Sequence, residues 1–444
     1  MTNVDSTTTK KGGLHYAWIV LIGCSLMAGG SAGIIYNAAG IFFHPITSEL
    51  GFTTTKLAFW FMANGLAMVV ALPFVGSTLP KVNVRVILTA AGAIVLTAYA
   101  AMSFYHQAWQ WWISGAIIGS AGAFIMFVPI PVILSQWFAK RTGMAIGIAM
   151  SFMGITPAIL NPVLTNFINT IGWRPTYLIA AAIGAVMVFP STIFLIRFKP
   201  ADKGLKPYGY EEGAEAAAPV SHHGASATSG ATDGQPKRGI TVKKALASPA
   251  FYILMISFAF MTLVAGVGQL LPSFASSVFS VSMGAKEAAI FGSTMVSVSL
   301  ISNILFKLIF GGASDKLGAL PSSLVTLAII VTAFLVLYFT GGSATLALIG
   351  AALVGVAPAF YSVGTPIVVR AIFGDLDYAK IYSYLSMGVN VAGAFTLPTM
   401  AFMAQTFHFA NTFLIAAGVI VFVIFALTFA FQLSKKFNRQ PEMV

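Results

Sequence analysis

A single lysine, Lys307, lies within an otherwise apolar run, NILFKLIF, at residues 303–310. A charged side chain in a helix that crosses a bilayer is costly unless it faces water or a partner of opposite charge, so it is a candidate for function. Asn303 precedes the lysine by one helical turn and would share its face of the helix. This pair predicts a site for an anion, and a carboxylate would supply the counter-charge.

The acidic residues are placed so that none could neutralise this lysine from the middle of an apolar run. All 12 fall in predicted loops, tails or helix ends: Asp5, Glu49, Asp202, Glu211, Glu212, Glu215, Asp233, Glu287, Asp315, Asp375, Asp377 and Glu442. The predicted site is therefore positive, which favours an anion and disfavours a cationic drug, whose binding needs an embedded acid. The alternative is that Lys307 snorkels to the nearby polar end of its run and binds nothing.

Polar and aromatic residues at mid-span positions could complete such a site. Tyrosine hydroxyls donate hydrogen bonds to carboxylates, and aromatic faces select small side chains by shape. Each of these residues is also compatible with ordinary packing between helices. The candidates are Tyr36, Asn37, Phe124, Phe127, Gln269, Tyr361, Tyr382, Tyr384 and Asn390. We favour Tyr361 and Tyr382 among them, together with Asn303.

Composition places the elements that carry these residues in lipid. The chain of 444 residues is 58% hydrophobic and 8% charged, with a mean hydropathy of +0.88, whereas soluble domains contain about 25% charged residues. The sequence contains no phosphate-binding loop, nucleophile elbow or cluster of metal ligands, so we expect neither an enzyme nor a bound cofactor or metal. The N-terminus lacks the pattern of a cleaved signal peptide, and the one cysteine, Cys24, implies no disulfide framework.

Twelve apolar stretches reach the length of about 20 residues that a helix needs to cross a bilayer. They begin near Tyr16, Leu57, Val86, Trp111, Gly143, Pro175, Phe251, Ala288, Ser322, Ala344, Ile381 and Ala410. The predicted fold is an all-α integral membrane protein with two six-helix bundles, at 15–196 and 249–433. The segment 197–248 is rich in Ala, Ser and Gly and is interpreted as a flexible cytoplasmic linker, with tails at 1–14 and 434–444.

The distribution of basic residues predicts the orientation of the chain. If the N-terminus is cytoplasmic, every Lys and Arg lies on the cytoplasmic side except Lys56, Arg174, Lys286 and Lys307. This bias is typical of a multi-pass protein with both termini in the cytoplasm. The net charge of +12 is dispersed over short loops that face anionic lipid, so nucleic acid is not a predicted partner.

Two motifs narrow the interpretation further. The loop GGASDKLG, residues 311–318, resembles the motif that follows the second helix of each half in the major facilitator superfamily. The stretch QWFAKRTGMAIGIAMSFMG, residues 136–154, is similar to the start of the fifth helix in the monocarboxylate porters and oxalate:formate antiporters of that superfamily. The end of the first span and both ends of the linker also fit, so the resemblance covers residues 15–433.

The resemblance implies two bundles of major facilitator type around a central site that opens alternately to either side. It implies secondary active transport of small organic monocarboxylates such as lactate, pyruvate or formate, with Lys307 at the position of the family's basic residue. It also implies a latch on the cytoplasmic side, in which Asp315 caps or pairs with a neighbouring helix end. The latch would comprise Gly311, Asp315, Lys316, Lys140 and Arg141. In the first half, Gly76 and Arg85 fit this motif, but Pro80 stands where the acid belongs.

Departures from the family pattern leave the coupling mechanism open. Asn37 and Asn303 stand where proton-coupled relatives carry Lys and Asp, which disfavours proton symport unless the proton travels on the substrate or on Lys307. A buried lysine, unlike arginine, can lose its proton. The second basic residue of the oxalate antiporters is absent from 382–390, and one cation suits a monocarboxylate.

Three alternatives stand beside monocarboxylate transport. They are an anion exchanger of the oxalate:formate type, an exporter of amphiphilic compounds, and a membrane receptor that moves no substrate. We expect a functional monomer in a prokaryotic cytoplasmic membrane whose partners are an organic anion and the lipid bilayer. The sequence leaves open co-transport of protons and the need for an ancillary subunit.

Overall fold

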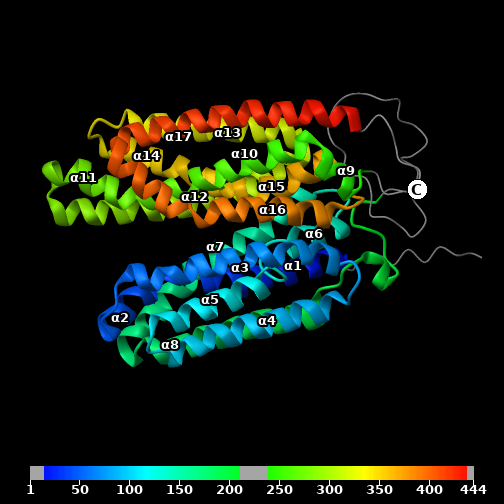
Figure 1. Cartoon of the computed structure of the whole chain (residues 1–444), viewed down its shortest axis with the longest axis horizontal. Helices are drawn as coiled ribbons and strands as arrows, with labels where there is room; N and C mark the ends of the chain where they lie inside the picture. Colours follow the sequence, from blue (N-terminus) through cyan, green and yellow to red (C-terminus); the bar gives the residue numbers. More distant parts are fainter. Residues whose placement is uncertain (1–14, 211–238, 438–444) are drawn as a thin grey trace, which may run out of the picture.

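The computed structural model describes residues 15–210 and 239–437. Its helices run alongside one another in two bundles, one from each half of the chain (Figure 1). The segment 211–238 is flanked by residues that lie at one end of the molecule, called here the linker end. The opposite end, where α2 (Gly40–Leu50) and α11 (Leu271–Met283) lie, is called the far end.

The first bundle contains α1 (Tyr16–Ala28), the π-helical η1 (Gly29–Asn37), α2, α3 (Thr54–Thr78), α4 (Val84–Ala101), η2 (Met102–Phe104), α5 (Ala108–Gly122), α6 (Pro129–Trp137), α7 (Thr142–Ile171), α8 (Trp173–Pro190) and η3 (Ser191–Leu195). The short helices η4 (Pro200–Lys203) and α9 (Val242–Ala247) lie on either side of the segment 211–238. The second bundle contains α10 (Pro249–Ala265), η5 (Gly266–Leu270), α11, α12 (Ala285–Leu317), α13 (Ala319–Tyr338), α14 (Ala344–Val354), α15 (Val356–Phe373), α16 (Tyr378–Ala394) and α17 (Thr396–Phe437).

Local sequence explains where these helices begin and end. Ser248 accepts a hydrogen bond from the backbone N–H of Ala250 at 3.1 Å, which caps the first turn of α10. Single glycines with φ near +90° join successive helices at Gly172, Gly284 and Gly318. Only glycine adopts this backbone without strain, so each joint reverses the chain within one residue.

Ten helical stretches within the described residues are long and apolar enough to cross a membrane. They match the expected spans except those that begin near Trp111 and Ile381. The first of these is divided, because α5 ends at Gly122 and α6 begins at Pro129. The second, α16, has 17 residues and continues into α17 across Phe395. The all-helical membrane fold is therefore confirmed. Ten of the twelve expected spans are single helical stretches long and apolar enough to cross a membrane, and the other two are divided or shorter.

Helix irregularities occur at corresponding places in the two bundles. The first span changes to a π-helix at η1, and the first span of the second bundle changes to a 3₁₀-helix at η5. The fourth span is interrupted between α5 and α6, and its counterpart is interrupted at Gly355, between α14 and α15. Paired interruptions in two repeats are typical of helices that line a transport site.

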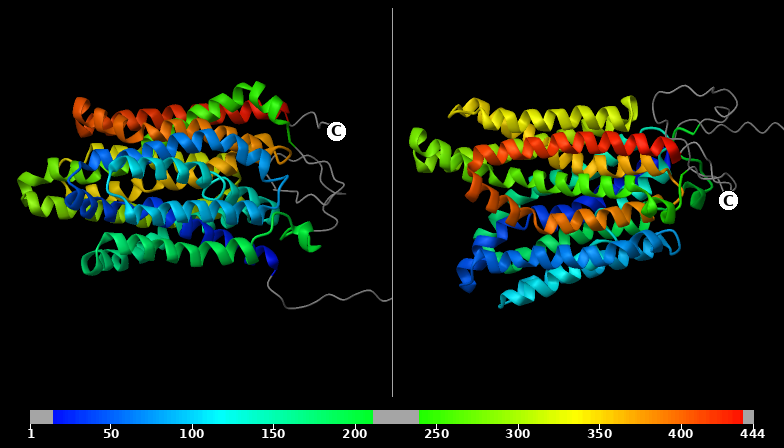
Figure 2. Two further views of the ribbon diagram at one scale, coloured as in Figure 1. Left: turned by 60° about the horizontal axis from the view of Figure 1, so that its bottom comes forward. Right: turned by 45° about the horizontal axis from the view of Figure 1, so that its top comes forward.

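The two bundles approach each other at the linker end and diverge toward the far end (Figure 1). Figure 2 shows the same helices from two further sides. Helix α7 packs along α12, and α3 packs along α16. These contacts are so close that a Cβ at Gly147 would lie 2.4 Å from the carbonyl oxygen of Lys307, and a Cβ at Gly76 would lie 2.5 Å from that of Ala379. Glycine therefore allows the backbones to touch, and the linker end is closed.

Both described ends of the expected linker, 197–248, are hydrogen-bonded to the bundles. Tyr208 forms backbone hydrogen bonds with Trp137 (2.8 Å), the last residue of α6, and with Ala139 (3.0 Å), which lies between α6 and α7. On the other side, the N–H of Ile240 donates to the carbonyl oxygen of Phe373 at 3.1 Å. These contacts fix 199–210 and 239–247 on the bundles. The middle of the expected linker, 211–238, lies outside the described residues, as do the N-terminal tail and residues 438–444. The first four residues of the expected C-terminal tail, 434–437, belong to α17.

Candidate functional site

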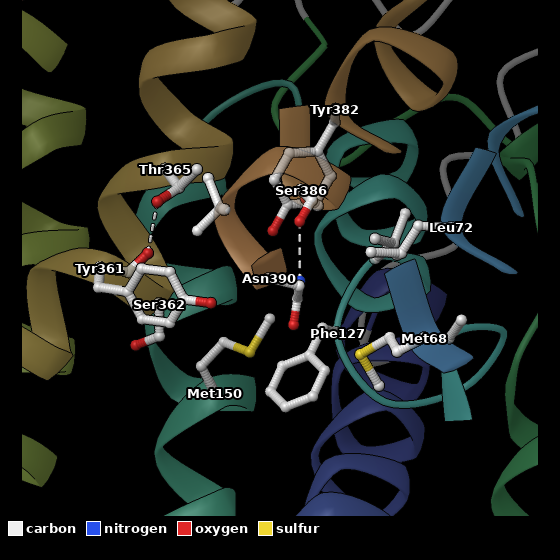
Figure 3. Close-up of a pocket in the computed structure, with 13 residues that line it drawn as sticks. Met68, Leu72, Phe127, Met150, Tyr361, Ser362, Thr365, Tyr382, Ser386 and Asn390 are labelled. Carbon is white, nitrogen blue, oxygen red and sulfur yellow. Dashed lines mark hydrogen bonds between the residues drawn. The ribbon is translucent and has the colours of Figure 1, made fainter. Parts of the chain in front are cut away.

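A cavity lies between the two bundles near the middle of their helices, and Figure 3 shows the side chains around it. The empty space between its lining atoms amounts to about 510 Å³, a volume that includes open solvent. The second bundle supplies its polar groups, from α15 and α16: Tyr361, Ser362, Thr365, Tyr382, Ser386 and Asn390. The first bundle supplies apolar side chains: Met68, Leu72, Ala123, Phe127, Val128 and Met150. The cavity thus has one polar wall and one apolar wall.

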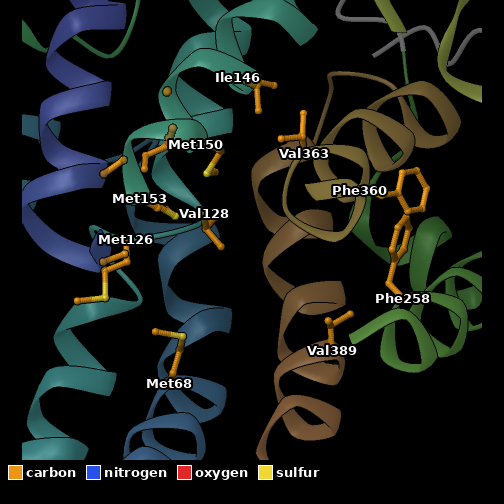
Figure 4. Packing of buried hydrophobic residues seen from close by; sticks show 14 of the residues in the cluster. Met68, Met126, Val128, Ile146, Met150, Met153, Phe258, Phe360, Val363 and Val389 are labelled. Atoms are coloured by element: carbon orange, nitrogen blue, oxygen red, sulfur yellow. The ribbon is translucent and has the colours of Figure 1, made fainter. Parts of the chain in front are cut away.

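The apolar wall is rich in methionine. Met68 on α3 and Met150 on α7 line the cavity, and Met126 and Met153 lie behind them (Figure 4). On the other side of the interface, Val389 of α16 completes the cavity. Methionine is flexible and polarisable, so this wall can adjust its shape to a ligand or to a movement of the bundles.

The polar wall presents hydroxyl groups and one amide. Tyr361 of α15 and Tyr382 of α16 both line the cavity (Figure 3). Asn390 donates its Nδ2 hydrogen to the carbonyl oxygen of Ser386 at 2.8 Å, which directs Oδ1 toward the cavity (Figure 3). The structure therefore brings together four of the residues proposed from sequence, Tyr361, Tyr382, Asn390 and Phe127.

Lys307 lies immediately behind the apolar wall. Its side chain is buried, with 6% exposure, and its Nζ donates to the backbone carbonyl oxygen of Met150 at 3.3 Å. The carbonyl of Lys307 faces Gly147, three residues closer to the linker end along α7. The side chain therefore extends away from the linker end and toward the cavity, opposite to the direction that snorkelling requires.

No carboxylate among the described residues forms an ion pair with Lys307. Glu49 pairs with Arg174 at the far end, Asp375 pairs with Arg370, and Asp377 pairs with Lys380. Backbone carbonyls accept a hydrogen bond from an ammonium group but do not neutralise its charge. Within the described part of the chain, the region around the cavity is therefore positive and suited to an anion.

The other residues proposed from sequence lie outside the cavity lining. Asn303 lies on α12 with its backbone N–H against Gly355. Asn37 is exposed and donates to the carbonyl oxygen of Met153 at 2.8 Å. Gln269 is exposed on η5. The mid-span positions of these residues could not reveal which side of the helix faces the cavity.

At the linker end, Asp315 of α12 lies at the start of α7. Its two carboxylate oxygens accept hydrogen bonds from the N–H groups of Gly143 (2.7 Å) and Met144 (2.8 Å). These donors are free in the first turn of a helix, where the helix dipole also favours a negative charge. Asp315 therefore links the two bundles by capping a helix of the other half, and its action as a conformational latch remains a prediction.

Arg370 of α15 is a further member of this contact that sequence reasoning missed. It pairs with Asp375 at 2.6 Å and donates to the hydroxyl of Thr142, the first residue of α7, at 3.3 Å. Arg141 and Arg370 both act electrostatically on Asp315. Of the other residues proposed for the latch, Gly311 is buried against Gly143, whereas Lys140, Arg141 and Lys316 are exposed at the linker end.

A family model described as Major Facilitator Superfamily matches residues 24–296 and 289–443 of this chain. Monocarboxylate transporter 11 of Homo sapiens is 23% identical over 193 residues, 43% of this chain and 41% of that protein. Monocarboxylate transporter 4 of Rattus norvegicus is 26% identical over 165 residues, 37% of this chain and 35% of that protein. The chain thus spans about two fifths of the length of these curated relatives.

Solved structures share the fold over nearly the whole chain. A bacterial homologue of the iron transporter ferroportin, in an outward-facing state, aligns with a TM-score of 0.66 and 14% identity over 94% of this chain and 99% of that one. The E. coli fucose:proton symporter aligns with a TM-score of 0.66 and 12% identity over the same shares of the two chains. At such identities the likeness concerns the arrangement of helices and not the ligand.

Proposed function

Because the chain belongs to the Major Facilitator Superfamily, we propose that it is a secondary active transporter of small organic monocarboxylates, such as lactate, pyruvate or formate. It works by alternating access, in which the two bundles rock about the central cavity. The named function of two relatives, monocarboxylate transport, supports the same substrate class. Transport is driven by gradients, without a cofactor and without chemical conversion of the substrate.

The observation that carries this proposal is the setting of Lys307. The ammonium is buried beside the cavity and is held by one backbone carbonyl, with no carboxylate paired to it in the described chain. A charge buried without a counter-ion is unfavourable, and an anionic substrate relieves this cost. The carboxylate pairs with Lys307 in place of the carbonyl of Met150, while Tyr361 and Tyr382 supply additional hydrogen-bond donors.

The cavity favours one carboxylate over two. A second carboxylate on the substrate would face the wall formed by Met68, Leu72 and Phe127. That wall offers no charge and no donor, and an unpaired charge in apolar surroundings is strongly disfavoured. A short monocarboxylate instead places its charge toward Lys307 and its carbon chain against the methionines.

The mode of coupling follows from which groups can bind a proton. Asn37 and Asn303 do not titrate, so they cannot relay one. This favours exchange or uniport, unless Lys307 itself carries the proton. An anion exchanger of the oxalate:formate type is therefore the second candidate, and it differs from the first in its coupling and in its acceptance of oxalate.

Counterflow in proteoliposomes tests these functions together. Purified protein is reconstituted into vesicles loaded with unlabelled lactate, and uptake of labelled lactate is measured with formate, pyruvate, oxalate and octanoate as competitors. Competition by short monocarboxylates supports the proposal, and competition mainly by oxalate supports the exchanger. If no carboxylate competes, the assignment of an anionic substrate is wrong, and an exporter of amphiphilic compounds becomes the better candidate.

A pH gradient across the same vesicles distinguishes the coupling modes. Net accumulation of lactate driven by an inward proton gradient indicates symport, and Lys307 is then the suspected proton carrier. Fast exchange without accumulation indicates an antiporter or uniporter. We further propose that the linker end faces the cytoplasm of a prokaryotic cell and that the monomer is the transporting unit.

A further inference from the structure

A hydrogen-bonded pair, Tyr36 of η1 and Asn64 of α3, lies behind the apolar wall and is not among the cavity-lining residues. The hydroxyl of Tyr36 donates to Oδ1 of Asn64 at 2.5 Å. Asn64 is 3% exposed, and its Nδ2 has no hydrogen-bond partner in the described structure. A buried amide donor without an acceptor is unfavourable and rare, so it points to a group that is present only part of the time.

The position of this pair connects it to the cavity. The ring of Tyr36 lies 6.0 Å from that of Phe127, which lines the cavity. Asn64 precedes Met68, another lining residue, by one turn of α3. The pair therefore lies directly behind Phe127 and Met68, in the wall whose methionines can adjust to a ligand.

The direction of the hydrogen bond determines what the pair can recognise. Because the proton of Tyr36 is held by Asn64, the phenol oxygen is left as an acceptor. The free Nδ2 of Asn64 is a donor. A ligand that matches both groups must donate one hydrogen bond and accept another, as an alcohol does. A carboxylate only accepts, so it finds no partner in the oxygen of Tyr36.

We propose that the Tyr36–Asn64 pair recognises the substituent next to the carboxylate and selects 2-hydroxy acids over 2-oxo acids. This proposal rests on the proposed function, with the substrate carboxylate paired to Lys307. A 2-hydroxyl group donates to Tyr36 and accepts from Asn64. A 2-oxo oxygen accepts from Asn64 but leaves the oxygen of Tyr36 unpaired. Asn64 is thus a specificity-determining residue. Because it accepts the phenol proton of Tyr36, the lone pairs of the Tyr36 oxygen are left for the substrate.

The test compares lactate with pyruvate as competitors of labelled lactate counterflow. The measured quantity is the ratio of their half-inhibition concentrations in the unmodified protein, in Tyr36→Phe and in Asn64→Leu. We expect Tyr36→Phe to reduce the preference for lactate about fivefold, because only lactate loses a hydrogen bond. We expect Asn64→Leu to reduce it at least as much and to strengthen pyruvate, because the freed phenol proton can donate to the oxo group.

The ratio is internal to each sample, so a reduced amount of folded protein does not change it. Tyr105→Phe is the matched control, since Tyr105 forms a 2.5 Å hydroxyl contact with Ser114 away from the cavity, and its ratio should equal that of the unmodified protein. A ratio that stays within about twofold in both test variants overturns the selection by Tyr36 and Asn64, while lactate transport itself stands. Failure of both acids to compete in the unmodified protein overturns the proposed function as well.

Discussion

The ammonium of Lys307 on α12 lies 3.3 Å from the carbonyl oxygen of Met150 on α7, so this contact joins the two bundles beside the cavity. Under the proposed function, a substrate carboxylate would replace the carbonyl of Met150 at Lys307 and so remove this link. Binding is thereby connected to the relative position of the bundles, because the same lysine serves both contacts. A ligand can shift such an equilibrium only if it binds the two states differently, and this exchange of partners provides the difference.

Replacing Lys307 by Gln should abolish transport while the protein still folds. The side chain keeps similar volume and hydrogen-bonding capacity but loses the charge, and loss of one partner of a buried pair costs about 2–5 kcal/mol. We therefore expect kcat/KM for lactate counterflow to fall by about 30-fold or more. Lys307→Arg keeps the charge with a different shape and should retain partial activity.

Equal expression and equal thermal unfolding temperature would show that the Lys307 variants fold. Transport by Lys307→Gln at the rate of the unmodified protein would mean that the anion binds elsewhere. The same result would revive the interpretation of Lys307 as a residue without a ligand.

The sequence predicted the fold well because the lengths of apolar stretches and the positions of charged residues can be determined along the chain, without knowledge of tertiary contacts. It also identified Tyr361, Tyr382, Asn390 and Phe127, which line the cavity. It placed Gln269 among them because a polar residue in mid-span can face the cavity, the lipid or another helix. Only the rotation of the helix about its axis, which depends on packing, distinguishes these cases.

The residues that the sequence did not reveal depend on contacts across the two halves. Arg370 reaches Thr142, which is 228 positions earlier in the chain, and no local pattern indicates this pairing. Asn64 is a polar residue in an apolar helix, and only its surroundings in the fold show that its Nδ2 is unpaired among the described residues. The division of the cavity into a polar and an apolar wall likewise emerges only when α3 and α7 meet α15 and α16.

Replacing Asp315 by Asn should favour opening of the linker end. The substitution removes the charge at the start of α7 and one of the two oxygens that accept from Gly143 and Met144. Loss of a helix cap costs about 1 kcal/mol, so we expect the equilibrium between the two open states to shift about fivefold. Accessibility of a cysteine placed at Ser362 in the cavity, in a Cys24→Ser background, measures this shift with impermeant maleimides.

Asp202→Asn is a matched control for that experiment, because Asp202 also lies at the linker end but accepts from Lys199 within its own half. It should leave the labelling rate from either side unchanged. An equal change in both variants would show that net charge at this end, and not the contact with α7, governs the opening.

A methyl group at Gly147 should hinder closure of the linker end. Its Cβ would lie 2.4 Å from the carbonyl oxygen of Lys307, whereas a Cβ at Gly312 would meet no atom within 4 Å. Overpacking of this kind costs about 1–3 kcal/mol, so Gly147→Ala should slow counterflow about tenfold. Gly312→Ala on α12 should transport normally, and similar loss in both variants would show that the space left at Gly147 does not explain the effect.

An acid at position 80 should add a second cap that the protein lacks. Gly311 contacts Gly143 at the start of α7, and Gly76 contacts Ala379 at the start of α16 in the same manner. Asp315 follows Gly311 by four residues, and Pro80 follows Gly76 by four. A carboxylate at position 80 would therefore lie near the first N–H groups of α16, where Asp377 makes no side-chain cap.

We expect Pro80→Asp to stabilise the state with the linker end closed by about 1 kcal/mol and to slow transport several-fold. Pro80→Asn and Pro80→Ala separate the charge from the loss of proline. Cavity labelling from the far-end side should increase in Pro80→Asp alone, and Asp315→Asn in the same chain should restore the original balance. If Pro80→Ala slows transport equally, proline fixes this loop for another reason, and the absence of the acid has no bearing on how the bundles close.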